Sequence, residues 1–222
     1  MSLGTVNMDY GSFYSLLKGN YRKGVHRFRT MLANPELAED FSRNLGSVSV
    51  ILGWPIGYDD KNSQELLGLL LASEVLTQAT LTWLGQWYPE NNEDSDTMYG
   101  DATRCQELVD NALMWRAVGS DPAGCGKLVV TLSGGNCADF ADIHAVVADS
   151  EAMAAIAAVP AAMQALIASP IAFPTAAASA TAVEKILGNS DALGAVVASE
   201  DAMEAMISSP MALSAMVASE TV

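Results

Sequence analysis

Two adjoining ten-residue stretches decide the fold: "SEDAMEAMIS" at Ser199–Ser208 and "SPMALSAMVA" at Ser209–Ala218. They repeat one pattern without a gap, and related segments occur earlier in the chain: "SEAMAAIAAV" from Ser150 and "SDALGAVVAS" from Ser190. Each stretch combines a small polar residue, an alanine and several large apolar residues. The first question is therefore what structure a repeat of ten residues specifies.

The first residue of each block has the chemistry of a helix N-cap. Eight of the nine block starts are Ser, Asp or Asn, whose side chains accept the free N–H groups of a first helical turn. The position that follows holds Pro160, Pro170 and Pro210, and proline is tolerated at the first helical residue. Counted in tens, the blocks begin at Asp139, Asp149, Val159, Ser169, Ser179, Asn189, Ser199, Ser209 and Ser219.

The apolar residues of each block fall on one helical face. Alanine stands three residues after the cap in every complete block except the first, where Asp142 replaces it. Large apolar residues follow at spacings of three and four, which share a face of a helix. One continuous helix is the competing interpretation, but each internal proline would cost it about 3 kcal/mol. The pattern therefore predicts short helices joined by tight turns and stacked as a solenoid, with an irregular turn near Pro174.

Residues 1–138 differ in composition and are expected to form a separate N-terminal domain, mainly helical with a minor β element. "NLGSVSVILGW" and "KLVVTLSGG" are rich in β-branched residues and bounded by glycine, which favours a strand pair. Asn34 before Pro35 is a cap-and-proline helix start. The expected helices are Tyr10–Lys18, Tyr21–Leu32, Pro35–Asn44, Ser63–Trp87 and Met98–Val118.

Composition restricts the classes of partner. The chain carries 26 acidic and 11 basic side chains and a net charge of −15, which disfavours nucleic acid as a partner. The start lacks the pattern of a secretory signal, and Glu74 at the centre of the most apolar run disfavours a membrane span. Cys105, Cys125 and Cys137 match no zinc-site spacing, and either three reduced thiols or a disulfide remains possible.

Two segments of the N-terminal domain have side chains that could form contacts. "YRKGVHRFR" gathers Arg22, Lys23, Arg27 and Arg29, which form either a solvated helix face or a docking face for another protein. "SGGNC" (Ser133–Cys137) is typical of a flexible turn, and it could instead form an anion-binding nest or present a thiol nucleophile. Cys137 is the candidate accessible thiol. No phosphate loop, dinucleotide fingerprint or catalytic motif is present in the sequence. We therefore expect no enzyme activity, cofactor or metal.

The decapeptides resemble the tandem repeats of virion structural proteins, often tail-fibre proteins, of tailed bacteriophages. "SPMALSAMVA" and "SEDAMEAMIS" carry the resemblance, which covers Asp139 to Val222 and does not extend to residues 1–138. It implies a virion location after synthesis in the host cytoplasm, with other virion structural proteins as partners. It assigns no role to any single residue.

The last complete blocks carry large apolar side chains that a solenoid leaves uncovered at its end. We expect an interface there, with a homo-oligomer, in the simplest case a trimer, formed through Met203, Met206, Met211, Leu213, Met216 and Val217. The leading hypothesis is thus a virion protein that docks through residues 1–138 and assembles through residues 139–222. Two alternatives are an enzyme in residues 1–138 with the repeats as an assembly tag, and a cellular adhesion or scaffold module.

Overall fold

The computed structural model describes residues 20–43, 61–86 and 97–219. It is mainly helical, as the sequence predicts, and these described residues contain no β-strand. The chain divides into two compact units, Met1–Gln86 and Trp87–Val222, and each is considered by itself.

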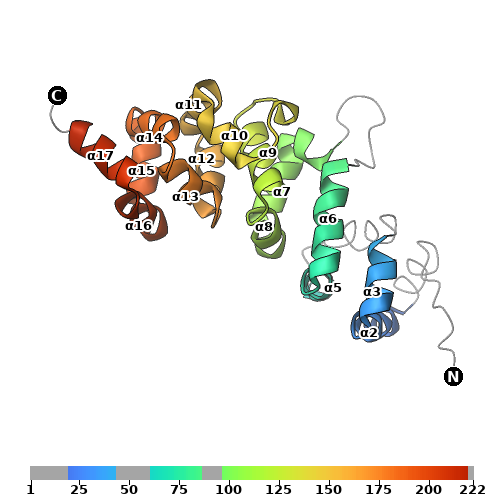
Figure 1. The fold of residues 1–222 in the computed structure, drawn as a ribbon. Coiled ribbons are helices and arrows are strands. Elements are labelled where there is room, and N and C mark those ends of the chain that lie inside the picture. Colours follow the sequence, from blue (N-terminus) through green and yellow to red (C-terminus); the bar gives the residue numbers. More distant parts are fainter. Residues whose placement is uncertain (1–19, 44–60, 87–96, 220–222) are drawn as a thin grey trace. The chain divides into compact units, whose positions relative to one another are not determined.

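The first unit contains two described helix pairs (Figure 1). Helix α2 packs on α3, where the rings of Phe28 and Phe41 lie 5.5 Å apart, and α5 and α6 join through a bend of 107°. Asn34 caps α3 by accepting from the amides of Glu36 and Leu37. The bounds are α2 Tyr21–Leu32, α3 Pro35–Ser42, α5 Lys61–Leu71 and α6 Glu74–Gln86.

The second unit is an array of short helices. Most are six to eleven residues long, as expected for ten-residue blocks that each end in a tight turn. In chain order they are η1 Met98–Gly100, α7 Ala102–Asp110, α8 Ala112–Val118, α9 Pro122–Leu132, η2 Cys137–Asp139, α10 Ile143–Ala148, α11 Ser150–Ala158, α12 Pro160–Ala168, α13 Ala172–Ala177, α14 Ala180–Leu187, α15 Ser190–Val197, α16 Glu200–Ser208 and α17 Pro210–Ser219.

The predicted caps are present from Asp149 onward. The side chains of Asp149, Ser179, Asn189 and Ser199 accept from backbone amides of the first turns of their helices. The hydroxyls of Ser169 and Ser209 accept from the amides of Ala172 and Ala212. Val159, which has no polar side chain, forms no side-chain cap for α12, and neither does Ile171, the residue directly before α13. The ten-residue phase therefore specifies where each of these helices begins.

The array stacks with three helices to a turn. The axes of α11 and α12 bend by 105° at their junction, so three successive helices nearly complete a turn. Each helix from α9 to α14 accordingly packs on the helix three places later, for example α11 on α14 and α14 on α17 (Figure 1). The hydroxyls of Ser179 and Ser209 donate to the carbonyls of Val147 and Ala177, 32 residues earlier in each case. These bonds tie one turn to the turn before it.

The repeat begins about 40 residues earlier than the sequence interpretation placed it. Asp101, Asn111 and Asp121 cap α7, α8 and α9 at the same ten-residue spacing. The seventh residue after the cap, here called position +7, is at most 1 % exposed in nine of these helices. These nine residues are Leu108, Val118, Leu128, Ile156, Leu166, Ala176, Ile186, Val196 and Met206. Position +7 therefore forms the buried axis of the stack.

Three secondary-structure predictions for the N-terminal region are wrong. "KLVVTLSGG" lies largely in helix α9, because Asp121 and Pro122 start a helix and the β-branched residues are buried against α10, α11 and α12. The expected helix Ser63–Trp87 divides at Ala72–Ser73, and the expected helix Met98–Val118 divides at Asp101 and Asn111, which act as caps. The other strand candidate and Tyr10–Lys18 lie outside the described residues.

The predicted cap at Asp139 is also wrong. Asp139 ends the short helix η2, and Asp142 caps α10 by accepting from the amides of His144 and Ala145. This explains why Asp142 breaks the alanine pattern: in this block the helix starts three residues late. A Cβ on Gly126 would lie 2.5 Å from the amide nitrogen of Ile143, so the close approach of α9 to this late start requires glycine. The irregularity expected near Pro174 is present, since α13 begins only at Ala172 and has six residues.

Candidate functional site

The apolar positions that face the following turn become exposed in the final turn. Positions +4 and +8, the fourth and eighth residues after each cap, lie on the side of each helix that the helix three places later covers. In the inner turns these residues are mostly buried, as for Met153 at 0 % and Ala177 at 1 % exposure. No helix three places later follows α15, α16 or α17 among the described residues, and there Val197 is 61 % and Ile207 55 % exposed.

The candidate site is therefore the outer side of α15–α17, which we call the terminal face. Its exposed large apolar side chains are Val197, Ile207, Leu213 and Val217, each at position +4 or +8 of its helix. Singly exposed apolar residues are ordinary on a protein surface, but several on one side of a single turn indicate an interaction surface. Helices α15–α17 contain no cysteine, lysine or histidine, and the exposed large side chains of the terminal face are aliphatic.

The structure distributes the predicted interface residues between the surface and the interior. Leu213 is 42 % exposed and belongs to the terminal face. Met211 is 44 % exposed but stands two residues after its cap, on another side of α17, and Met203 and Met216 are half-buried. Met206 occupies position +7 and is 1 % exposed, so it contributes to the axis of the stack. Val197 and Ile207 were missed by the sequence reasoning, although their shared place eight residues after Asn189 and Ser199 was a signal that could have found them.

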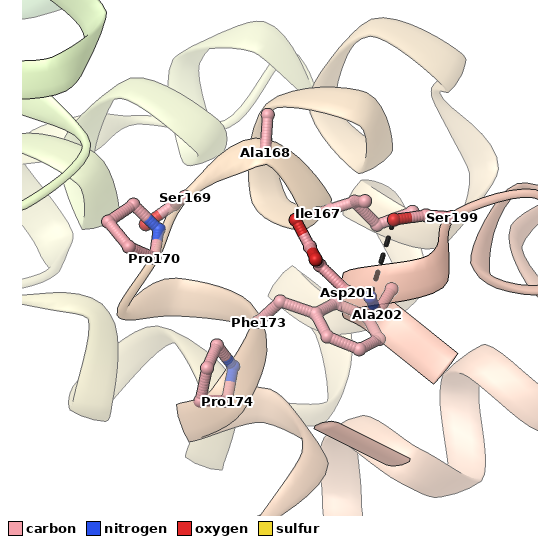
Figure 2. Close-up of a pocket in the computed structure, with 9 residues that line it drawn as sticks. All are labelled: Ile167, Ala168, Ser169, Pro170, Phe173, Pro174, Ser199, Asp201 and Ala202. Carbon is pink, nitrogen blue, oxygen red and sulfur yellow. Dashed lines mark hydrogen bonds between the residues drawn. The ribbon is translucent and has the colours of Figure 1, made fainter. Parts of the chain in front are cut away.

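A second surface feature lies beside the terminal face, between α13 and α16. A cavity of about 450 Å³ lies between the corner at Ser169–Pro170 and the first turn of α16, and its lining residues are drawn in Figure 2. It exists because α13 starts late and leaves space beside Ser199 and Ala202, whose hydroxyl and amide form the cap bond drawn there. Phe173 and Pro174 form its apolar wall, and the carboxylate of Asp201 extends into it.

An adjoining cavity of about 480 Å³ continues along the same two helices. It shares Pro174 and Asp201 with the first cavity and adds Glu204 and Pro210 to the lining. We call the pair the α13–α16 groove. Its walls are mostly proline, alanine and serine, with two exposed carboxylates. Neither carboxylate forms an ion pair among the described residues.

The predicted basic docking face lies on α2 in the first unit. Arg22, Lys23, Arg27 and Arg29 are all exposed, while Val25, Phe28 and Met31 of the same helix are buried. Arg29 pairs with Glu65 at 2.7 Å, and the described residues supply no ion pair to the other three. The structure thus leaves most of this positive charge at the surface.

The three cysteines are free thiols in different environments. Cys105 and Cys125 are buried at position +4 of α7 and α9, and burial raises the pKa of both thiols, that of Cys125 to about 12. Cys137, the predicted accessible thiol, lies in η2 and is half-buried. Burial likewise raises the pKa of Tyr99, whose phenol oxygen has no hydrogen-bond partner within the described part of the chain.

The described residues contain no group of three or more His, Cys, Asp or Glu side chains that could hold a metal ion. No single helix within them is long and apolar enough to cross a membrane. Two sharply bent pairs reach the required length and composition, Gln64–Leu71 with Glu74–Gly85 and Ser150–Ala158 with Pro160–Ala168.

Comparison with known proteins yields no relative: no family model, curated protein or solved structure matches this chain.

Proposed function

We propose that this chain is a non-enzymatic assembly protein whose helical array binds other protein chains through the terminal face. The observation that supports the proposal is the contrast at positions +4 and +8. These positions are mostly buried in the inner turns, but Val197 and Ile207 are more than half exposed in the last turn. Because these two side chains are already partly buried, a partner that covered the exposed remainder would gain about half of the 1.5–3 kcal/mol of full burial, or about 1–1.5 kcal/mol each.

The resemblance of the decapeptides to repeats of tailed-bacteriophage virion proteins supports the proposal that this assembly role belongs to a phage particle. We propose a tail or neck fibre, or a fibre adaptor, whose N-terminal region docks onto the virion and whose repeats bind further copies or other virion proteins. A trimer around the fibre axis is the simplest homo-oligomer for this role. The array suits a spacer, because each turn is bonded to the turn before it through cap hydroxyls.

Light scattering coupled to size-exclusion chromatography tests the assembly role on the full chain. We expect a concentration-dependent oligomer that Val197→Asp and Ile207→Asp each weaken at least tenfold, since a carboxylate would have to be buried. Ala154→Asp, at an exposed position of α11, is the matched control and should leave association unchanged. A wild-type chain that stays monomeric at every concentration would contradict self-assembly through this face.

Mass spectrometry of purified phage particles tests the location separately. A virion structural protein is present in every particle preparation at a fixed copy number relative to the major capsid protein. Its absence from particles made by a phage that expresses the chain would remove the virion proposal, even where the purified chain self-associates.

A further inference from the structure

The α13–α16 groove and helix α2 have complementary charge. Helix α16, which forms one wall of the groove, carries Glu200, Asp201 and Glu204 and no Lys, Arg or His. Helix α2 is the reverse, because it carries five basic or imidazole side chains and no carboxylate. Each element therefore lacks within itself the charge that the other supplies.

The groove fits long basic side chains better than a compact ion. Lysine and arginine place their aliphatic stems on apolar walls while the charged group stays at the rim. Pro174 and Pro210 supply such walls, and Asp201 and Glu204 stand three residues apart on α16, on one face of the helix. Lys23 and Arg27, four residues apart, share a face of α2 in the same way and are exposed.

We propose that α2 of one copy docks in the α13–α16 groove of a second copy, with Lys23 and Arg27 over Asp201 and Glu204. The second copy is the chosen occupant because this chain itself carries a well-formed, exposed basic helix that matches the groove in charge. The two surfaces differ, so the contact is heterologous: each copy offers one helix and one groove, and copies add head to tail.

This contact goes beyond the assembly role proposed for the terminal face, since it uses different residues and a different force. Salt distinguishes the two contacts. Added salt that shortens the Debye length from about 14 Å to about 4 Å screens surface charge pairs and so weakens the contact between α2 and the groove. Apolar burial at the terminal face is not weakened by added salt. Either contact can therefore fail while the other remains.

Charge reversal in the full chain tests the proposal by sedimentation velocity at low and high salt. The basic-reversed chain carries Lys23→Glu with Arg27→Glu, and the acid-reversed chain carries Asp201→Lys with Glu204→Lys. For each reversed chain alone, we expect the salt-sensitive association constant to fall at least tenfold. An equimolar mixture of the two should regain this association, because the reversed helix of one chain matches the reversed groove of the other in charge.

Two controls keep the outcome readable. Glu151→Lys with Asp191→Lys makes the same charge change in first turns outside the groove and should leave association unchanged. All chains are compared again with Val197→Ser and Ile207→Ser added, which removes two of the exposed aliphatic side chains of the terminal face. Circular dichroism confirms that every variant is helical. The proposal is overturned if association persists in both reversed chains, if mixing them restores nothing, or if the wild-type chain shows no salt-sensitive association.

Discussion

The inner turns and the last turn of the array are built from nearly the same ten-residue blocks, yet their surfaces differ. In α11 and α14, position +4 holds Met153 and Val183, both 0 % exposed, and the same position in α17 holds Leu213 at 42 %. The residue types hardly change, but the coverage does, because α14 lies on α11 and α17 lies on α14. In a repeat of this kind, burial is thus a property of the neighbouring turn as much as of the side chain.

This contrast also explains why alanine is retained three residues after the cap. Ala162, Ala172, Ala182, Ala192, Ala202 and Ala212 are all at most 1 % exposed, in the last turn as in the inner ones. These alanines line the side that faces the preceding turn, which every one of their helices has. A larger side chain there would push two turns apart, so the small residue sets the spacing of the stack.

Truncation of matched isoleucines should give the largest effect. Ile156→Ala removes a side chain that is 0 % exposed at the axis of the stack, and we expect the free energy of unfolding to fall by about 2–5 kcal/mol. Ile207→Ala removes a side chain that is 55 % exposed, and the loss for the monomer should stay within about 0.5 kcal/mol. Urea titrations followed by circular dichroism measure both, and equal losses would contradict the difference in coverage.

Two glycines at the same repeat position should respond in opposite directions. Gly126 and Gly194 both lie five residues after their caps, in α9 and α15. The Cβ of Gly126→Ala would meet the backbone of α10 at 2.5 Å, which should cost about 1–3 kcal/mol. A Cβ on Gly194 has nothing within 4 Å, so Gly194→Ala should stabilise α15 by about 0.5–1 kcal/mol. Thermal melts that shift in the same direction would show that this difference in packing is wrong.

The caps offer a smaller and more selective comparison. The hydroxyl of Ser209 both caps α17 and donates to the Ala177 carbonyl one turn earlier, whereas Ser199 only caps α16 among the bonds described. Ser209→Ala should therefore cost about 2 kcal/mol and Ser199→Ala about 1 kcal/mol. Ser190→Ala, at an exposed position in the first turn of α15, is the neutral control. A larger loss for Ser199→Ala than for Ser209→Ala would rule out the bond between turns as a source of stability.

The part of the fold that could be predicted from sequence is the part where local chemistry repeats without interruption. From Asp149 onward the cap residues and the apolar spacing agree with each other, and the predicted helix starts are confirmed to within one or two residues. Before Asp149 the same caps at Asp101, Asn111 and Asp121 went unrecognised. The 28 residues from Asp121 to Asp149 break the ten-residue phase, and Arg104, Trp115 and Cys125 hide the alanine-and-methionine pattern.

The three-helix turn and both candidate surfaces lay beyond the sequence. The spacing of apolar residues shows which face of a helix is buried, but it does not show which later helix covers that face. The covering helix depends on the angle between successive helices, which is 105° between α11 and α12. Val197 and Ile207 stand at the same repeat position as the buried Ala157 and Ala177, so only their lack of a covering turn separates them from these residues. The α13–α16 groove arises from the late start of α13, for which Pro174 gave a hint of irregularity but no geometry.

Thiol labelling compares the first and last turns with the least disturbance of the fold. Position +4 holds Cys125 in α9, and it holds the half-buried Met203 in α16. Burial raises the pKa of Cys125 to about 12, so at pH 8 its reactive thiolate is scarce and shielded. We expect iodoacetamide to label Met203→Cys and Cys137 within minutes on the native chain and to leave Cys125 and Cys105 unlabelled until denaturant is added.

The pH dependence of stability follows from the same burial. Because the folded state holds the Cys125 proton more tightly than the unfolded chain, its contribution is fully present below the ordinary thiol pKa and is lost as the pH rises toward 12. The melting temperature should therefore fall between about pH 8 and pH 10, a window that starts near the ordinary thiol pKa. The fall should be smaller in Cys125→Ala.

In the thiol-labelling experiment, mass spectrometry of tryptic peptides assigns the sites that iodoacetamide labels. Rapid native labelling of Cys125, or protection of Met203→Cys equal to that of Cys125, would contradict the proposed difference in coverage between the two turns.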